Sequence, residues 1–179
     1  MYQKFFRLIY MSCILVFIPL LVNAELSTRD AWDNLKKLLE TGGYQVIGQE
    51  ITVGPDLSIK NVQISSEVDA QTDITFDIGS LDLTKNKDGF INISLPEEIY
   101  VQYLNEDEFG YKTEASILVR ARELDFKVSG KLSQVLYQLT ASSAGFALVE
   151  LLDNGVVSPD FSAEMEFVLA DVNSTIRVA

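Results

Sequence analysis

The side chains of this sequence that could do chemistry are carboxylates, because the chain has no histidine and one cysteine, Cys13. Two acidic clusters stand out, Glu97-Glu98 and the stretch 105–108, which reads Asn-Glu-Asp-Glu. A glycosidase uses two such groups across a sugar, one as acid and one as base or nucleophile. Both clusters lie at predicted turns in a chain with 26 acidic residues, so solvated loops are the favoured interpretation.

Calcium is a second use for acidic loops, since the ion needs several converging oxygens. The loops around Asp107 and Asp153 lack the spaced pattern of a calcium-binding loop. Beyond residue 24 there is neither histidine nor cysteine, which excludes Ser-His-Asp and Cys-His arrangements, ordinary zinc sites and axial haem ligation by those residues. We therefore predict no catalytic, cofactor-binding or metal-binding residue, no cofactor, and no enzymatic activity.

Charge narrows the choice of partners. The formal net charge is −12, and it becomes −14 without Lys4 and Arg7, the only charged residues of the first 24. Such a surface repels phosphate backbones and anionic lipid head groups. We therefore expect no nucleic-acid partner.

The N-terminus has the pattern of a secretory signal. Lys4 and Arg7 precede an apolar run from Leu8 to Val22, and small residues at 22–24 mark a cleavage site after Ala24. An uncleaved anchor is the alternative, but the run is shorter than the roughly 18–20 residues of a spanning helix. We predict a signal peptide over 1–24, a periplasmic location, and a mature chain without a membrane span. The lack of cysteine after residue 24 agrees with a bacterial periplasmic protein.

A helix is predicted over Ser27–Thr41. Ser27 or Thr28 can cap it, Asp30 suits its positive start, and Gly42-Gly43 ends it. Apolar residues recur along one face of this helix, which we expect to pack on a sheet: Ala31, Trp32, Leu35, Leu38 and Leu39.

After residue 43 the apolar residues alternate, as in strands with one buried face. Ile74, Phe76 and Ile78 form one such series, and Gly79 then shifts the phase, which indicates a bulge. The stretches 132–139 and 144–152 fit a helix or a strand, and we assign both as strands. The predicted fold is mainly β: the helix, over 25–43, packs on a curved antiparallel meander, a sandwich or half-barrel, over 44–179.

Several loose motifs resemble an uncharacterised bacterial family of exported proteins, domain of unknown function 2125. They lie at 31–35, 42–46, 94–100, 128–130, 136–143 and 148–152. The sequence departs from the family at Ser142-Ser143, where an acidic residue is expected. The resemblance implies a β-rich protein of alphaproteobacterial type with no assigned activity. Family members are longer, so it also implies that this sequence is the N-terminal part of such a protein.

Three functions follow as hypotheses. The first is a non-catalytic scaffold or interaction module that contacts envelope proteins. The second is a carrier that holds a lipid or other apolar ligand on the concave side of the sheet, and the third is a carboxylate-dependent enzyme acting on envelope glycans. The first requires a filled core, in which Phe76 and Phe126 are buried while Asp77 and Lys127 face the other way. The oligomeric state is left open.

Overall fold

The computed structural model describes residues 25–157 and 165–178, so the predicted signal peptide lies outside the described residues. One helix, α2 (Thr28–Thr41), precedes the strands. The strands, in chain order, are β1 (Gln45–Val53), β2 (Asp56–Asp69), β3 (Thr72–Lys85), β4 (Ile91–Ser94), β5 (Glu98–Glu106), β6 (Lys112–Arg122), β7 (Asp125–Lys131), β8 (Gln134–Asp153), β9 (Val156–Val157) and β10 (Met165–Val178).

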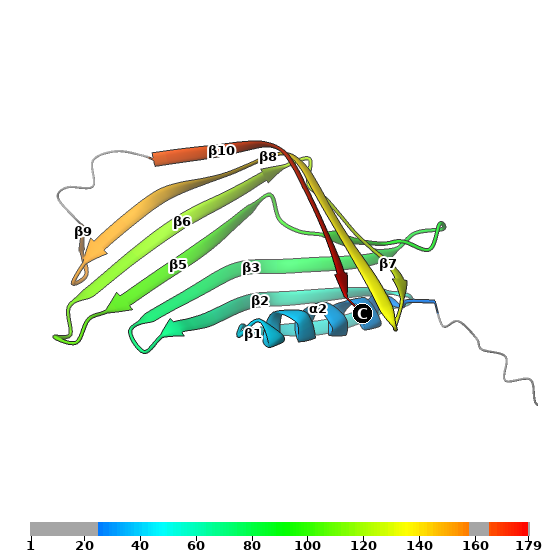
Figure 1. Cartoon of the computed structure of the whole chain (residues 1–179), viewed down its shortest axis with the longest axis horizontal. Coiled ribbons are helices and arrows are strands. Elements are labelled where there is room, and N and C mark those ends of the chain that lie inside the picture. Colours follow the sequence, from blue (N-terminus) through cyan, green and yellow to red (C-terminus); the bar gives the residue numbers. More distant parts are fainter. Residues whose placement is uncertain (1–24, 158–164, 179) are drawn as a thin grey trace, which may run out of the picture.

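The strands form one curved antiparallel meander, which confirms the predicted fold class (Figure 1). β3 pairs with β4 near one end and with β5 near the other, and β8 pairs in the same way with β7 and β6. β4 and β5 are therefore two pieces of one long strand, interrupted at Leu95–Glu97. β6 and β7 are likewise interrupted at Glu123-Leu124. Both ambiguous stretches are parts of β8, as predicted.

A line of backbone irregularities crosses the sheet. Four residues have a positive φ there, Asn61 at 52°, Gly79 at 74°, Glu123 at 50° and Asp171 at 52°. The register between β1 and β2 shifts at Gly48, and that between β2 and β3 shifts beside Asn61 and Gly79. The bulge predicted at Gly79 is thus one of a series of irregularities. Together they keep the apolar side chains on the same face of the sheet on both sides of this line.

The helix begins and ends as predicted. Ser27 and Asp30 form a reciprocal capping box, and Gly42 ends the helix. Ala31 and Trp32 are buried, and the helix lies on one face of the sheet against β1, β2 and β3 (Figure 1). Among the described residues, no helix has the length and apolar character needed to cross a membrane.

The hydrophobic core lies under this helix. Both phenylalanines that were predicted to be buried are half-buried: Phe126 packs against the core, and Phe76 lies outside it. This buried cluster has no member from β5 or β6, although Val101, Ala115 and Leu118 of those strands are buried as well. Its buried residues are Leu26, Ala31, Trp32, Leu57, Ile59, Val62, Leu81, Leu83, Ile91, Ile93, Val128, Val135 and Tyr137.

Candidate functional site

The acidic pair Glu97-Glu98 lies where β4 gives way to β5. Glu98 accepts a hydrogen bond of 2.9 Å from Nε of Arg120, and both side chains are about half exposed. The carbonyl oxygen of Glu97 accepts a bond from the backbone nitrogen of Ala121. These contacts hold β5 against β6. The charged partner of Glu98 is the Arg120 guanidinium and not a second carboxylate.

The acidic stretch 105–108 forms the turn between β5 and β6. The Asp107 carboxylate accepts bonds of 2.9 and 2.8 Å from the backbone nitrogens of Phe109 and Tyr111. Glu106 forms an ion pair of 3.1 Å with Lys112. These contacts give the cluster a turn-forming role.

The loop after Asp153 docks beside this turn. The Asn154 side chain accepts a 2.9 Å bond from the backbone nitrogen of Lys112, and the Asn154 nitrogen donates to the Lys112 carbonyl. Within residues 25–157 and 165–178, no three acidic side chains gather closely enough to hold a metal ion.

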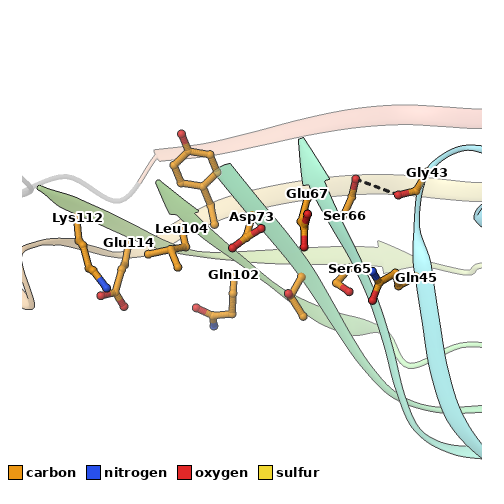
Figure 2. A pocket seen from close by; sticks show the side chains of 12 residues that line it. Gly43, Gln45, Ser65, Ser66, Glu67, Asp73, Gln102, Leu104, Lys112 and Glu114 are labelled. Atoms are coloured by element: carbon orange, nitrogen blue, oxygen red, sulfur yellow. Dashed lines mark hydrogen bonds between the residues drawn. The ribbon is translucent and has the colours of Figure 1, made fainter. Parts of the chain in front are cut away.

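A polar hollow of about 730 Å³ lies over β2, β3, β5 and β6 (Figure 2). Glu67 and Asp73 stand directly opposite each other on β2 and β3, and Leu104 separates Asp73 from Glu114 in the same row. Lys112 lies beside Glu114 at the far end (Figure 2). No sequence motif marked these residues, because they are ordinary outward positions of alternating strands.

A network around Glu50 joins α2 to β1. Its carboxylate accepts bonds from Trp32 Nε1 at 2.9 Å and Arg29 Nη1 at 2.7 Å, and Lys36 Nζ lies 3.5 Å away. Burial raises the pKa of Glu50, but the bonds from Trp32 and Arg29 and the nearby cationic charges outweigh it. The pKa of Glu50 therefore falls below its ordinary value of 4.5. These contacts hold α2 against β1.

The apolar face of the sheet continues beyond the helix. The strand register places one apolar residue of each strand directly opposite an apolar residue of the neighbouring strand. We call these residues the apolar row: Val46, Ile64, Phe76, Val101, Ile117, Leu148 and Met165. A parallel row on β5, β6 and β8 adds Ile99, Val119 and Phe146. The sequence predicted that Phe76 lies on an apolar face. It did not predict that apolar residues of seven strands lie opposite one another.

Most of this face lies outside the core. Phe76 and Ile117 are half-buried and Phe146 is 45% exposed, although Val101 between Phe76 and Ile117 is buried. Leu83 and Ile91 beneath the helix are fully buried. The described helix packs on β1, β2 and β3, so within the described part of the chain the apolar positions of β5, β6 and the second half of β8 have no second layer.

The chain matches no protein-family model, no curated protein and no solved structure.

Proposed function

We propose that this protein is a non-catalytic, exported carrier that holds an acyl chain against the apolar row. The observation that carries the proposal is the uncovered apolar face of β5, β6 and β8. A soluble domain gains free energy by covering such a face, at about 25 cal/mol per Å² of apolar surface. A large contiguous apolar surface without a covering layer is typical of a binding surface.

Length and charge favour an acyl chain. Strands in a sheet lie about 4.8 Å apart, so the part of the row from Phe76 on β3 to Leu148 on β8 is about 14 Å long. One leaflet's acyl chains span about half of a roughly 30 Å hydrocarbon core. The positions of β5 and β6 on this face are uncharged, and their polar residues, Tyr103, Asn105 and Thr113, lie towards the end near the β5–β6 turn.

The acidic surface restricts the head group. With a net charge of −12, the protein repels an anionic membrane surface. We therefore expect it to bind single lipid molecules, with a neutral or cationic head group preferred, instead of attaching to an anionic bilayer.

Binding is tested by titrating the protein with a fluorescent analogue of a monoacylglycerol, whose head group is uncharged. Phe76→Gln places an amide in the apolar row and should weaken binding at least tenfold, because an unpaired polar group then faces the chain. Thr75→Gln is the matched control, since Thr75 is the preceding residue of β3 and lies on the polar face. Equal affinity in the two variants would contradict the proposal.

Export is a separate part of the proposal. The apolar run with its cleavage site supports a mature chain that begins at Glu25 in the periplasm. N-terminal sequencing of protein recovered from the periplasm of a Gram-negative host tests it, and an intact Met1 in the membrane fraction would contradict it. The resemblance to domain of unknown function 2125 stays a prediction.

A further inference from the structure

The sheet has a gap where its interrupted strands meet. The ladder between β4 and β7 ends at Asn92 and Lys127, and the ladder between β5 and β6 begins at Glu98 and Arg120. The pairing is interrupted between these two ladders, and a hollow of about 370 Å³ lies there.

Residues of both faces of the sheet line this hollow. Ile93 belongs to the buried core, and Leu95 and Phe126 pack against that core. Asn92 is flanked along β4 by two core residues, so its side chain is on the opposite, polar face. The hollow therefore lies between the strands, with an apolar side and a polar side. We call it the gap hollow, and the residues that line it are Asn92, Ile93, Ser94, Leu95, Glu97, Glu123, Leu124, Asp125 and Phe126.

Asn92 brings an unused hydrogen-bond acceptor to the gap hollow. Its Oδ1 atom is buried and has no hydrogen-bond partner among the described residues. A buried acceptor without a donor is unfavourable. Because the last side-chain torsion of an asparagine is broad, the amide can turn its oxygen towards a donor in the hollow. A ligand with a hydroxyl or an ammonium group would supply that donor.

The charges around the gap hollow favour the same kind of ligand. Every polar side chain of its lining carries an acceptor oxygen, and none of the described residues that line it is basic. Asp125 pairs with Lys127, whereas Glu97 and Glu123 make no ion pair within the described residues. The hollow therefore suits a group that donates hydrogen bonds, and it disfavours an anionic one.

The gap hollow lies next to the uncovered apolar face. Ile99 and Val119 are directly opposite each other on that face, and Ile99 comes two residues after Glu97 and two residues before Val101 of the apolar row. Four residues of a strand span about 13 Å, at about 3.3 Å per residue. A lipid whose acyl chain lies over Ile99, Val119 and the apolar row can therefore place its head group in the hollow.

We propose that the gap hollow holds the head group of the bound lipid, and that this head group donates hydrogen bonds through hydroxyl or ammonium groups and carries no negative charge. The proposal rests on the carrier function proposed above, and it adds the place and the chemistry of head-group recognition. Asn92 is the specificity-determining residue, because its unused acceptor distinguishes a head group with a donor from one without.

The experiment compares ligands that share one acyl or alkyl chain and differ in the head group. A monoacylglycerol supplies hydroxyl donors, a long-chain primary amine supplies an ammonium group, and a fatty-acid methyl ester supplies no donor. Each one displaces the fluorescent monoacylglycerol analogue from the whole exported chain. The wild type should bind the monoacylglycerol, the amine, or both, about tenfold more tightly than the methyl ester. The comparison of the first two tells which donor the hollow prefers.

Asn92→Leu removes the unused acceptor and should bring the affinity for the preferred ligand to within about threefold of that for the methyl ester. The affinity for the methyl ester itself should not change, which also shows that the variant is folded. Thr84→Leu is the matched control, because Thr84 lies directly opposite Asn92 on β3 and is not part of the lining. It should keep the wild-type preference.

A second variant tests the acidic side of the hollow without changing a buried position. Glu97 and Glu123 are exposed, so their joint replacement by Gln should leave the fold intact and weaken binding of the amine. Equal affinities of the wild type for all three ligands would overturn the head-group site while leaving the carrier function in place, and so would a preference that persists in Asn92→Leu. If none of the ligands bound, the carrier function would be contradicted, and this proposal with it.

Discussion

The Tyr137 hydroxyl donates a 2.8 Å hydrogen bond to Oδ1 of Asn34, which ties the beginning of β8 to the helix that precedes the whole sheet in the sequence. The same hydroxyl lies 3.3 Å from the carbonyl oxygen of Ala31. Tyr137 is buried, and burial raises its pKa. The contact closes the core by joining residues about a hundred positions apart.

Replacing Tyr137 with phenylalanine should lower the free energy of unfolding by about 1–2 kcal/mol, because the part-buried Asn34 side chain loses its hydrogen-bond donor. Urea denaturation measures this loss. Tyr100→Phe is the control, since Tyr100 is 46% exposed and should change stability by less than about 0.5 kcal/mol. Equal effects would mean that the hydroxyl contact does not hold the helix.

The core and the open face should respond differently to truncation. Ile59→Ala should cost about 2–5 kcal/mol, because Ile59 is fully buried beneath the helix. Phe76→Ala should cost less, although it removes more atoms, because Phe76 is half-buried outside the core. Asp77→Ala, on the opposite face, should be within roughly 0.5 kcal/mol. A larger loss at Phe76 than at Ile59 would mean that its face is covered.

Acid should weaken the contact between α2 and β1. The pKa of Glu50 is lower in the folded protein than in the unfolded chain, so its stabilisation is present above about pH 4.5 and is lost as the pH falls through the folded value. Glu50→Gln should therefore cost about 1 kcal/mol near pH 6, and the gap to the wild type should close towards about pH 3. Denaturant titrations at both pH values test this, and a gap that widens in acid would contradict the assignment.

The hairpin between β7 and β8 depends on a glycine. A Cβ on Gly130 would lie 2.2 Å from the Gln134 carbonyl oxygen, and its φ is +109°. Gly130→Ala should therefore cost about 3 kcal/mol or more. Gly155→Ala is the matched comparison, because its φ is +76° but nothing lies within 4 Å, so only the backbone strain of about 1–2 kcal/mol applies. Thermal unfolding of both variants should rank them in this order.

Local patterns predicted much of the fold. Ser27 and Asp30 act within the first helix turn and Gly42 acts at the last, so the helix bounds followed from local sequence. Alternation around Phe76 placed this residue on the apolar face. The pairing of β3 with both β4 and β5 could not be predicted, because the break at Leu95–Glu97 looks like an ordinary turn. The polar hollow was missed because Glu67 and Asp73 meet only through strand register.

There is a physical reason why the sequence alone could not distinguish a scaffold from a carrier. The apolar stripe of α2 and the alternating strands predict a buried face, but they do not say how much of that face one helix covers. Only the packing shows that the buried cluster beneath the helix stops before β5 and β6. The extent of this cluster distinguishes the two hypotheses, because a scaffold requires a filled core, whereas a carrier requires an apolar face that a ligand can reach.

Native mass spectrometry of the purified protein tests the carrier proposal most directly. We predict a co-purifying lipid with an acyl chain and an uncharged or cationic head group, which is released when the protein is unfolded, and its loss from Phe76→Gln but not from Thr75→Gln. A wild-type protein that carries no such molecule, and takes up none when it is incubated with a monoacylglycerol, would contradict the central claim.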